Sequence, residues 1–274
     1  MEDGSAPPAF IYGTAWKEED TTDLVKTAVR AGFRAIDTAN QPHHYSEALV
    51  GEALKALAAG GIPRSSLFIQ TKFTPLDGHD HRVPYDPDLA LKDQVAQSFE
   101  SSLRHLNTDY LDSYLLHGPY TSAGLSASDW EVWGAIEAIH RSGRARMIGI
   151  SNVNAEQVRL LAAKSTVKPM IVQNRCYAKR GWDRLVRETC RMHGIAYQGF
   201  SLLTANRDVL RHPIVLSISR RLNVQAEQVI FRFAMQVGMI PLTGTRSEVH
   251  MREDLGVFDI RLTEEEVSLI ENGV

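Results

Sequence analysis

Three ionisable residues of this sequence stand where short apolar runs end: Asp37, Lys72 and His117. A lysine at the end of a buried run must be paired with an anion or lose its proton more readily, because desolvation disfavours the ammonium. Asp37 could supply the countercharge, and the three groups could then perform general acid–base chemistry. On these residues alone, two structural alternatives stay open: a rim ion pair for Lys72 and a packed core histidine for His117.

The elements that must position these residues are eight short apolar, β-rich runs. The predicted strands are Ala9–Tyr12, Arg34–Asp37, Leu67–Lys72, Tyr110–His117, Arg146–Ser151, Met170–Gln173, Ala196–Phe200 and Met239–Thr243. Between and after them, spacing near 3.6 residues predicts helices. These are Thr22–Ala31, Glu47–Ala59, Leu89–His105, Trp130–Arg141, Ala155–Ala163, Asp183–His193, Ala226–Val237 and Thr263–Asn272.

Residues at the ends of these segments agree with the predicted boundaries. Gly32, Gly143 and Gly194 each follow a helix, where a left-handed C-cap favours glycine. Asn154 is expected to be an N-cap, and Thr263 has a glutamate three residues on, as in a capping box.

Alternating strands and helices indicate parallel strands joined by helical crossovers. An open sheet of this kind usually carries a glycine-rich phosphate loop after its first strand, and neither G-x-G-x-x-G nor G-x-x-x-x-G-K occurs. The sequence therefore predicts one α/β domain over residues 1–274, a (β/α)8 TIM barrel. In such a barrel the active site lies where the strands end, which is where Asp37, Lys72 and His117 stand.

Composition narrows the class of protein further. The chain has 274 residues, a net charge of −3, 43% hydrophobic residues and 23% charged residues, so nothing favours binding to nucleic acid or to an anionic membrane. Two cysteines, Cys176 and Cys190, do not make a disulfide framework. Without a signal-like N-terminus or a long apolar run, we expect a cytoplasmic protein.

Several ordered motifs resemble the aldo-keto reductase family, from about Gly13 to Asn272. They are Gly13-Thr14-Ala15-Trp16, Gly32-Phe33-Arg34-Ala35-Ile36-Asp37-Thr38-Ala39, Leu67-Phe68-Ile69-Gln70-Thr71-Lys72, Thr108-Asp109-Tyr110-Leu111-Asp112, Leu115-Leu116-His117-Gly118-Pro119 and Gly143-Arg144-Ala145-Arg146-Met147-Ile148-Gly149-Ile150-Ser151-Asn152. The resemblance implies a nicotinamide-dependent enzyme that reduces an aldehyde or ketone to an alcohol, or catalyses the reverse reaction.

The resemblance also implies a catalytic set of Asp, Tyr, Lys and His. Three members fall on Asp37, Lys72 and His117, but Pro42 occupies the usual tyrosine spacing. Counting back from the helix start puts His44 in the tyrosine register, one residue before Tyr45. A loop insertion can absorb that slip, so we expect Tyr45 to be the acid–base residue, with its pKa lowered by Lys72. His117 would orient the substrate carbonyl.

Cofactor residues are implied by the same resemblance. Ser151, Asn152 and Gln173 match the residues that bind the nicotinamide carboxamide, and Phe200 matches the ring that stacks on it. The remaining expected cofactor contacts are Gly13, Thr14, Asp37, Ser201, Leu203, Thr243, Gly244, Thr245, Arg246, His250, Glu253 and Asp254.

At the adenosine end the chain departs from the family pattern. Leu242 replaces the usual lysine, so Arg246, or Arg252 as the alternative, is expected to hold the 2′-phosphate of NADPH instead, because an arginine fork suits phosphate. NADH is the alternative cofactor.

We expect Trp16, His44 and His117 to line the substrate pocket, no metal to be bound and the protein to be a monomer. The displaced tyrosine leaves one other function open: a nicotinamide-binding barrel with a regulatory or interaction role and little turnover.

Overall fold

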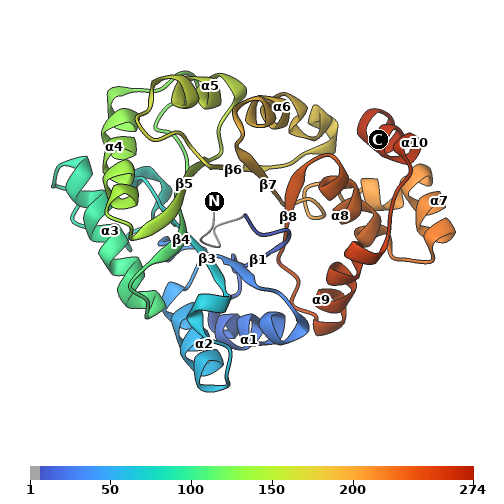
Figure 1. The fold of residues 1–274 in the computed structure, drawn as a ribbon, viewed down its shortest axis with the longest axis horizontal. Coiled ribbons are helices and arrows are strands. Elements are labelled where there is room, and N and C mark those ends of the chain that lie inside the picture. The colour runs from blue at the N-terminus through green and yellow to red at the C-terminus, as the bar shows by residue number, and fades with distance from the viewer. Residues whose placement is uncertain (1–6) are drawn as a thin grey trace.

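The computed structural model describes residues 7–274, which contain a closed barrel of eight parallel strands. The strands are β1 (Ile11–Gly13), β2 (Ala35–Asp37), β3 (Phe68–Phe73), β4 (Leu111–Leu116), β5 (Ala145–Ser151), β6 (Ile171–Arg175), β7 (Ala196–Phe200) and β8 (Met239–Thr243). Each strand pairs with the next along the chain, and β8 pairs with β1 (Figure 1). The predicted (β/α)8 barrel is confirmed, and the strand ends coincide with the predicted ones or differ from them by at most two residues.

The helices form a ring around the strands (Figure 1). They are α1 (Thr21–Ala31), α2 (Glu47–Ala59), α3 (Leu91–Leu106), α4 (Ala127–Arg141), α5 (Ala155–Lys164), α6 (Arg184–His193), α7 (Pro213–Leu222), α8 (Ala226–Gln236), α9 (Glu248–Leu255) and α10 (Glu264–Gly273). Two of them, α7 and α9, were not predicted from the sequence. Within residues 7–274, no helix is both long enough and apolar enough to cross a bilayer.

Local signals fix several of these helix ends. The Asn154 side chain accepts a hydrogen bond from the backbone N–H of Gln157 at 3.0 Å, and Thr263 does the same for Glu266 at 3.1 Å, so both predicted caps are confirmed. Gly143 and Gly194 have φ of +78° and +70°, as expected for left-handed C-cap positions.

The main core lies between the outward-facing strand residues and the ring of helices. Close approach is needed where α2 crosses α3: a Cβ on Gly51 would lie 1.9 Å from the carbonyl oxygen of His105. Gly149 meets the same constraint against the Ile171 carbonyl oxygen, at 2.2 Å. Neither position has room for a side chain.

The interior of the barrel changes from apolar to polar along its axis. Two clusters that include Ile11, Ala35, Leu115 and Ile171 fill its amino-terminal part. Strand residues two positions further on face the same way. The next inward layer therefore carries Asp37 and Gln173, and this polar layer forms the floor of the candidate site.

Candidate active site

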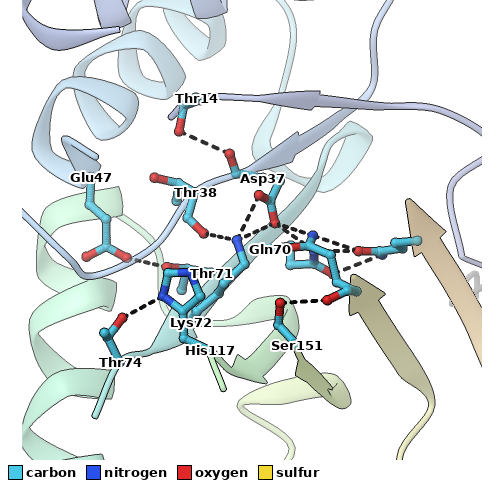
Figure 2. A network of polar contacts seen from close by, with 12 residues as sticks. Thr14, Asp37, Thr38, Glu47, Gln70, Thr71, Lys72, Thr74, His117 and Ser151 are labelled. Atoms are coloured by element: carbon cyan, nitrogen blue, oxygen red, sulfur yellow. Dashed lines mark hydrogen bonds and ion pairs between the residues drawn. The ribbon is translucent and has the colours of Figure 1, made fainter. Parts of the chain in front are cut away.

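An ion pair between β2 and β3 lies at the centre of the site (Figure 2). The Lys72 Nζ donates to both carboxylate oxygens of Asp37 at 2.7 Å and to the Thr38 carbonyl oxygen at 2.8 Å. Three acceptors match the three hydrogens of an ammonium group. Burial lowers the pKa of the fully buried Lys72, and the Asp37 charge opposes that shift. The lysine and its countercharge are paired as the sequence predicts.

Tyr45 lies in the loop between β2 and α2, and its ring borders the same cavity as Asp37. A turn in which the Gln41 carbonyl oxygen accepts the Tyr45 N–H at 3.1 Å sets its position. The Lys72 Nζ lies 5.4 Å from the centre of the Tyr45 ring, and the ring of His117 lies 6.0 Å away, centre to centre.

Burial, followed by the Asp37 charge, raises the pKa of Tyr45 above its ordinary value. This direction is opposite to the lowering that we expected from Lys72. The cause is the burial of the phenol, which disfavours the charged phenolate and outweighs any lowering by Lys72. Tyr45 is therefore a protonated phenol across the neutral range, the form that can donate a proton.

His44, the other residue near the tyrosine register, takes part in a different set of contacts. Its Nδ1 lies 2.6 Å from the Gln41 Oε1, and its ring lies 4.1 Å from the Trp16 ring. His44 does not line the cavity, whereas Trp16 does. The geometry brings Tyr45, and not His44, to the same cavity as His117.

His117 follows the end of β4 and lines the same cavity. Its Nδ1 lies 2.7 Å from the Thr74 hydroxyl, and its backbone N–H donates to the Phe73 carbonyl oxygen at 2.8 Å. Burial, followed by the charge of Lys72, lowers the pKa of His117 well below its ordinary value. A neutral imidazole whose Nδ1 accepts from Thr74 carries its hydrogen on Nε2, where it can donate to a ligand.

A cavity of about 650 Å3 connects these residues with the ends of β7 and β8. Sixteen of the predicted site residues line it: Gly13, Trp16, Asp37, Tyr45, His117, Ser151, Gln173, Phe200, Ser201, Leu203, Thr243, Gly244, Thr245, His250, Glu253 and Asp254. Carboxyl ends of strands thus supply one continuous binding surface, as expected for a barrel of this type.

Five predicted residues stand outside the lining. Lys72 is fully buried and donates to Asp37, and Thr14 is buried with its hydroxyl donating to the Asp37 carbonyl oxygen at 3.0 Å. Asn152 is exposed and donates to the His117 carbonyl oxygen at 2.8 Å. Arg246 pairs with Asp20. His44 is the fifth, held by the contacts described above.

Lys17 lines the cavity and was not predicted from the sequence. It is buried, and its Nζ donates to the Gly244 carbonyl oxygen. Burial, followed by the charge of Arg246, lowers the pKa of Lys17 to about 8. Its position directly after Trp16, in the loop that follows β1, was the signal available in the sequence.

The far end of the cavity, at β8, α8 and α9, is acidic. Glu227, Glu253 and Asp254 all line it. Burial raises the pKa of Asp254 to about 7, against the hydrogen bond at 2.7 Å that its carboxylate accepts from the Thr243 hydroxyl. This carboxyl group titrates near neutral pH.

Comparison with known proteins gives the family. The model of the aldo/keto reductase family matches residues 9–273. An uncharacterised oxidoreductase, YtbE, from Bacillus subtilis is 31% identical over 99% of this chain and 90% of its own length. A glyoxal reductase from the same organism is 29% identical, with the same coverage of both chains.

A solved aldo-keto reductase from Bombyx mori, in complex with NADP, superposes with a TM-score of 0.80 at 25% identity. The superposition covers 99% of this chain and 90% of that one. The predicted family is confirmed: the chain belongs to the aldo/keto reductases, the enzymes that interconvert carbonyl compounds and alcohols by hydride transfer.

Proposed function

We propose that this enzyme reduces an aldehyde or ketone with NADPH, with Tyr45 as the proton donor. The observation that carries the proposal is the convergence of Tyr45 and His117 on one cavity, above a buried pair of Lys72 and Asp37. When bound, the reduced nicotinamide supplies the hydride to the carbonyl carbon. The chain must supply a proton to the carbonyl oxygen and stabilise the charge that grows there.

The proton comes from the Tyr45 hydroxyl in this account. Its raised pKa keeps the phenol protonated at neutral pH, which suits carbonyl reduction. The neutral His117, with its hydrogen on Nε2, donates to the carbonyl oxygen and orients it. The Lys72 ammonium, 5.4 Å from the phenol ring, offsets the negative charge left on Tyr45 after the transfer.

The cavity offers a hydrogen-bond acceptor, an aromatic ring and a cation, a set that suits a nicotinamide dinucleotide. Among the described residues, none donates a hydrogen bond to the Oε1 of Gln173, so this oxygen can accept the carboxamide N–H at the catalytic end. The Phe200 ring lines the same wall and can stack on a planar ring. Further along, the buried Lys17 ammonium can pair with a phosphate group.

Preference for NADPH would depend on Arg246. Its side chain is 49% exposed and makes a surface pair with Asp20, and its Nη1 donates to the Trp16 carbonyl oxygen at 3.1 Å. An exposed pair contributes about 0–1 kcal/mol, so turning the guanidinium to a 2′-phosphate costs little. An arginine–phosphate contact with two hydrogen bonds would exceed that cost.

The test is a fluorescence titration with NADPH and NADH, followed by rate assays on a panel of aldehydes, ketones and alcohols. We expect tighter binding of NADPH and turnover of at least one carbonyl class. Because Tyr45 must be deprotonated to act as a base, alcohol oxidation should accelerate with rising pH while reduction changes little between pH 6 and 9. Binding without turnover on any substrate would contradict the proposal.

A further inference from the structure

A ring of three buried glutamines lies beside the Asp37 carboxylate, inside the barrel. Gln70 on β3, Gln173 on β6 and Gln198 on β7 point into the barrel at the level of Asp37. The Asp37 Oδ1 accepts the Gln70 Nε2 at 2.7 Å and the Gln173 Nε2 at 3.0 Å, in addition to Lys72 (Figure 2). Three strands, β2, β3 and β6, are thus joined through one carboxylate oxygen.

Gln198 completes the ring through Gln70 and Gln173 and makes no hydrogen bond to Asp37. Its Oε1 accepts the Gln70 Nε2 at 2.8 Å and the Gln173 Nε2 at 2.9 Å. Its own Nε2 donates to the Gln70 Oε1 at 3.1 Å. Gln70 and Gln198 are fully buried, and neither lines the cavity.

The carboxylate fixes which way each amide points. An ionised Asp37 only accepts hydrogen bonds, so Gln70 and Gln173 must both turn their NH2 groups to it. Gln198 must then present its oxygen to both of those NH2 groups. Because the Gln173 Nε2 donates to Asp37 and Gln198, its Oε1 is the atom left to accept a hydrogen bond from a ligand in the cavity. The acid–base centre and the cofactor-facing amide are therefore oriented by the same ring.

We propose that Gln70, supported by Gln198, is a positioning residue that holds Asp37 and Gln173 in register and so couples the acid–base centre to the nicotinamide site. The inference rests on the function proposed above. The two amide donors also partly compensate the negative charge of Asp37. This charge, together with burial, raises the pKa of Tyr45. Replacing Gln70 should therefore change the pKa of Tyr45 through Asp37.

The test replaces Gln70 with methionine, which keeps the length of the side chain and removes both amide functions. We expect kcat for carbonyl reduction to fall by about tenfold or more, since a hydrogen bond to a charged group is lost. The Kd of NADPH should rise, because Gln173 loses part of its support. With Asp37 less compensated, the pKa of Tyr45 should rise further, and the pH profile of alcohol oxidation should move to higher pH.

A matched control is Gln94→Met on α3. Gln94 is also buried and donates to the backbone oxygens of Pro87 and Leu89, away from the cavity. The Gln94→Met variant should lose thermal stability, as Gln70→Met does. It should keep the wild-type kcat, NADPH Kd and pH profile. If Gln70→Met matches Gln94→Met in all three readouts, the ring has only a structural role and the proposal is overturned.

If Gln70→Met does not fold, the Gln198→Met variant is used for the test instead. It frees both neighbouring amides without removing a donor from Asp37, so the NADPH Kd should rise while the pH profile keeps its position. An unchanged Kd would overturn the proposal. Failure of the wild-type enzyme to turn over any carbonyl would instead contradict the proposed function, and the NADPH Kd values of the variants would still decide the positioning role.

Discussion

Replacing Lys72 with methionine separates the two roles that the sequence leaves open for this residue, catalysis and structure. Lys72 is fully buried, and the Asp37 side chain is only 4% exposed. Removing one partner of such a pair leaves an uncompensated buried charge, which costs about 3–5 kcal/mol of unfolding free energy. Loss of the group that assists a general acid should in addition lower kcat by about 100-fold or more.

The double variant Asp37→Asn, Lys72→Met distinguishes these effects. With both charges removed, we expect roughly 1–3 kcal/mol of stability to return relative to Lys72→Met alone, because the two sites are coupled. The kcat should stay as low as in Lys72→Met, since the double variant still lacks the ammonium near Tyr45. Denaturant unfolding followed by fluorescence measures the first quantity, and steady-state reduction of an aldehyde measures the second.

Arg64→Met is the matched control at the opposite end of the barrel. Arg64 Nη1 lies 2.7 Å from the Asp112 Oδ2, and Asp112 keeps a second partner in Arg146 at 2.9 Å. This variant should lose some stability and keep its kcat. A folded Lys72→Met enzyme that reduces aldehydes within about threefold of the wild-type rate would refute a catalytic role for Lys72.

Two further predictions concern the adenosine end of the cavity. Arg246→Ala should raise the KM for NADPH by about 10-fold or more and leave that for NADH nearly unchanged, as expected for a lost charged hydrogen bond; equal effects on both cofactors would exclude Arg246 as the phosphate ligand. Asp254 has a folded-state pKa of about 7 against an ordinary 3.8, so the folded state holds this proton more tightly than the unfolded chain. The stability from that proton is complete below about pH 4 and is lost as the pH rises through about 7. Asp254→Asn should flatten this decline in the urea midpoint between pH 5 and 7.5, and an unchanged decline would show that Asp254 is not its source.

Much of the fold could be predicted because the spacing of the hydrophobic residues and the capping residues indicate the same element boundaries along most of the chain. The two missed helices break the expectation of one helix per crossover. α7 and α8 both lie between β7 and β8, and α9 is a short helix of eight residues with Glu248, Arg252 and Glu253 among them. Its few apolar positions give little helical periodicity to detect.

The candidate site was predictable where chemistry coincides with strand ends. Asp37, Lys72 and His117 are polar residues at the ends of apolar runs, a pattern that can be recognised in the sequence itself. Gln70 and Gln198 look like ordinary strand residues, because their partners are set by the register of β2, β3, β6 and β7 across the closed barrel. The direction of the Tyr45 pKa shift could not be predicted either, since it depends first on how completely the folded chain buries the phenol.

The most direct test of the central claim is the Tyr45→Phe variant in a single-turnover assay with NADPH and an aldehyde. We expect a rate at least about 100-fold below the wild-type rate, because the general acid is lost. The NADPH Kd should be nearly unchanged, and the matched variant His44→Asn should lose far less activity. A Tyr45→Phe enzyme that reduces the aldehyde at the wild-type rate would contradict the assignment of Tyr45 as the proton donor.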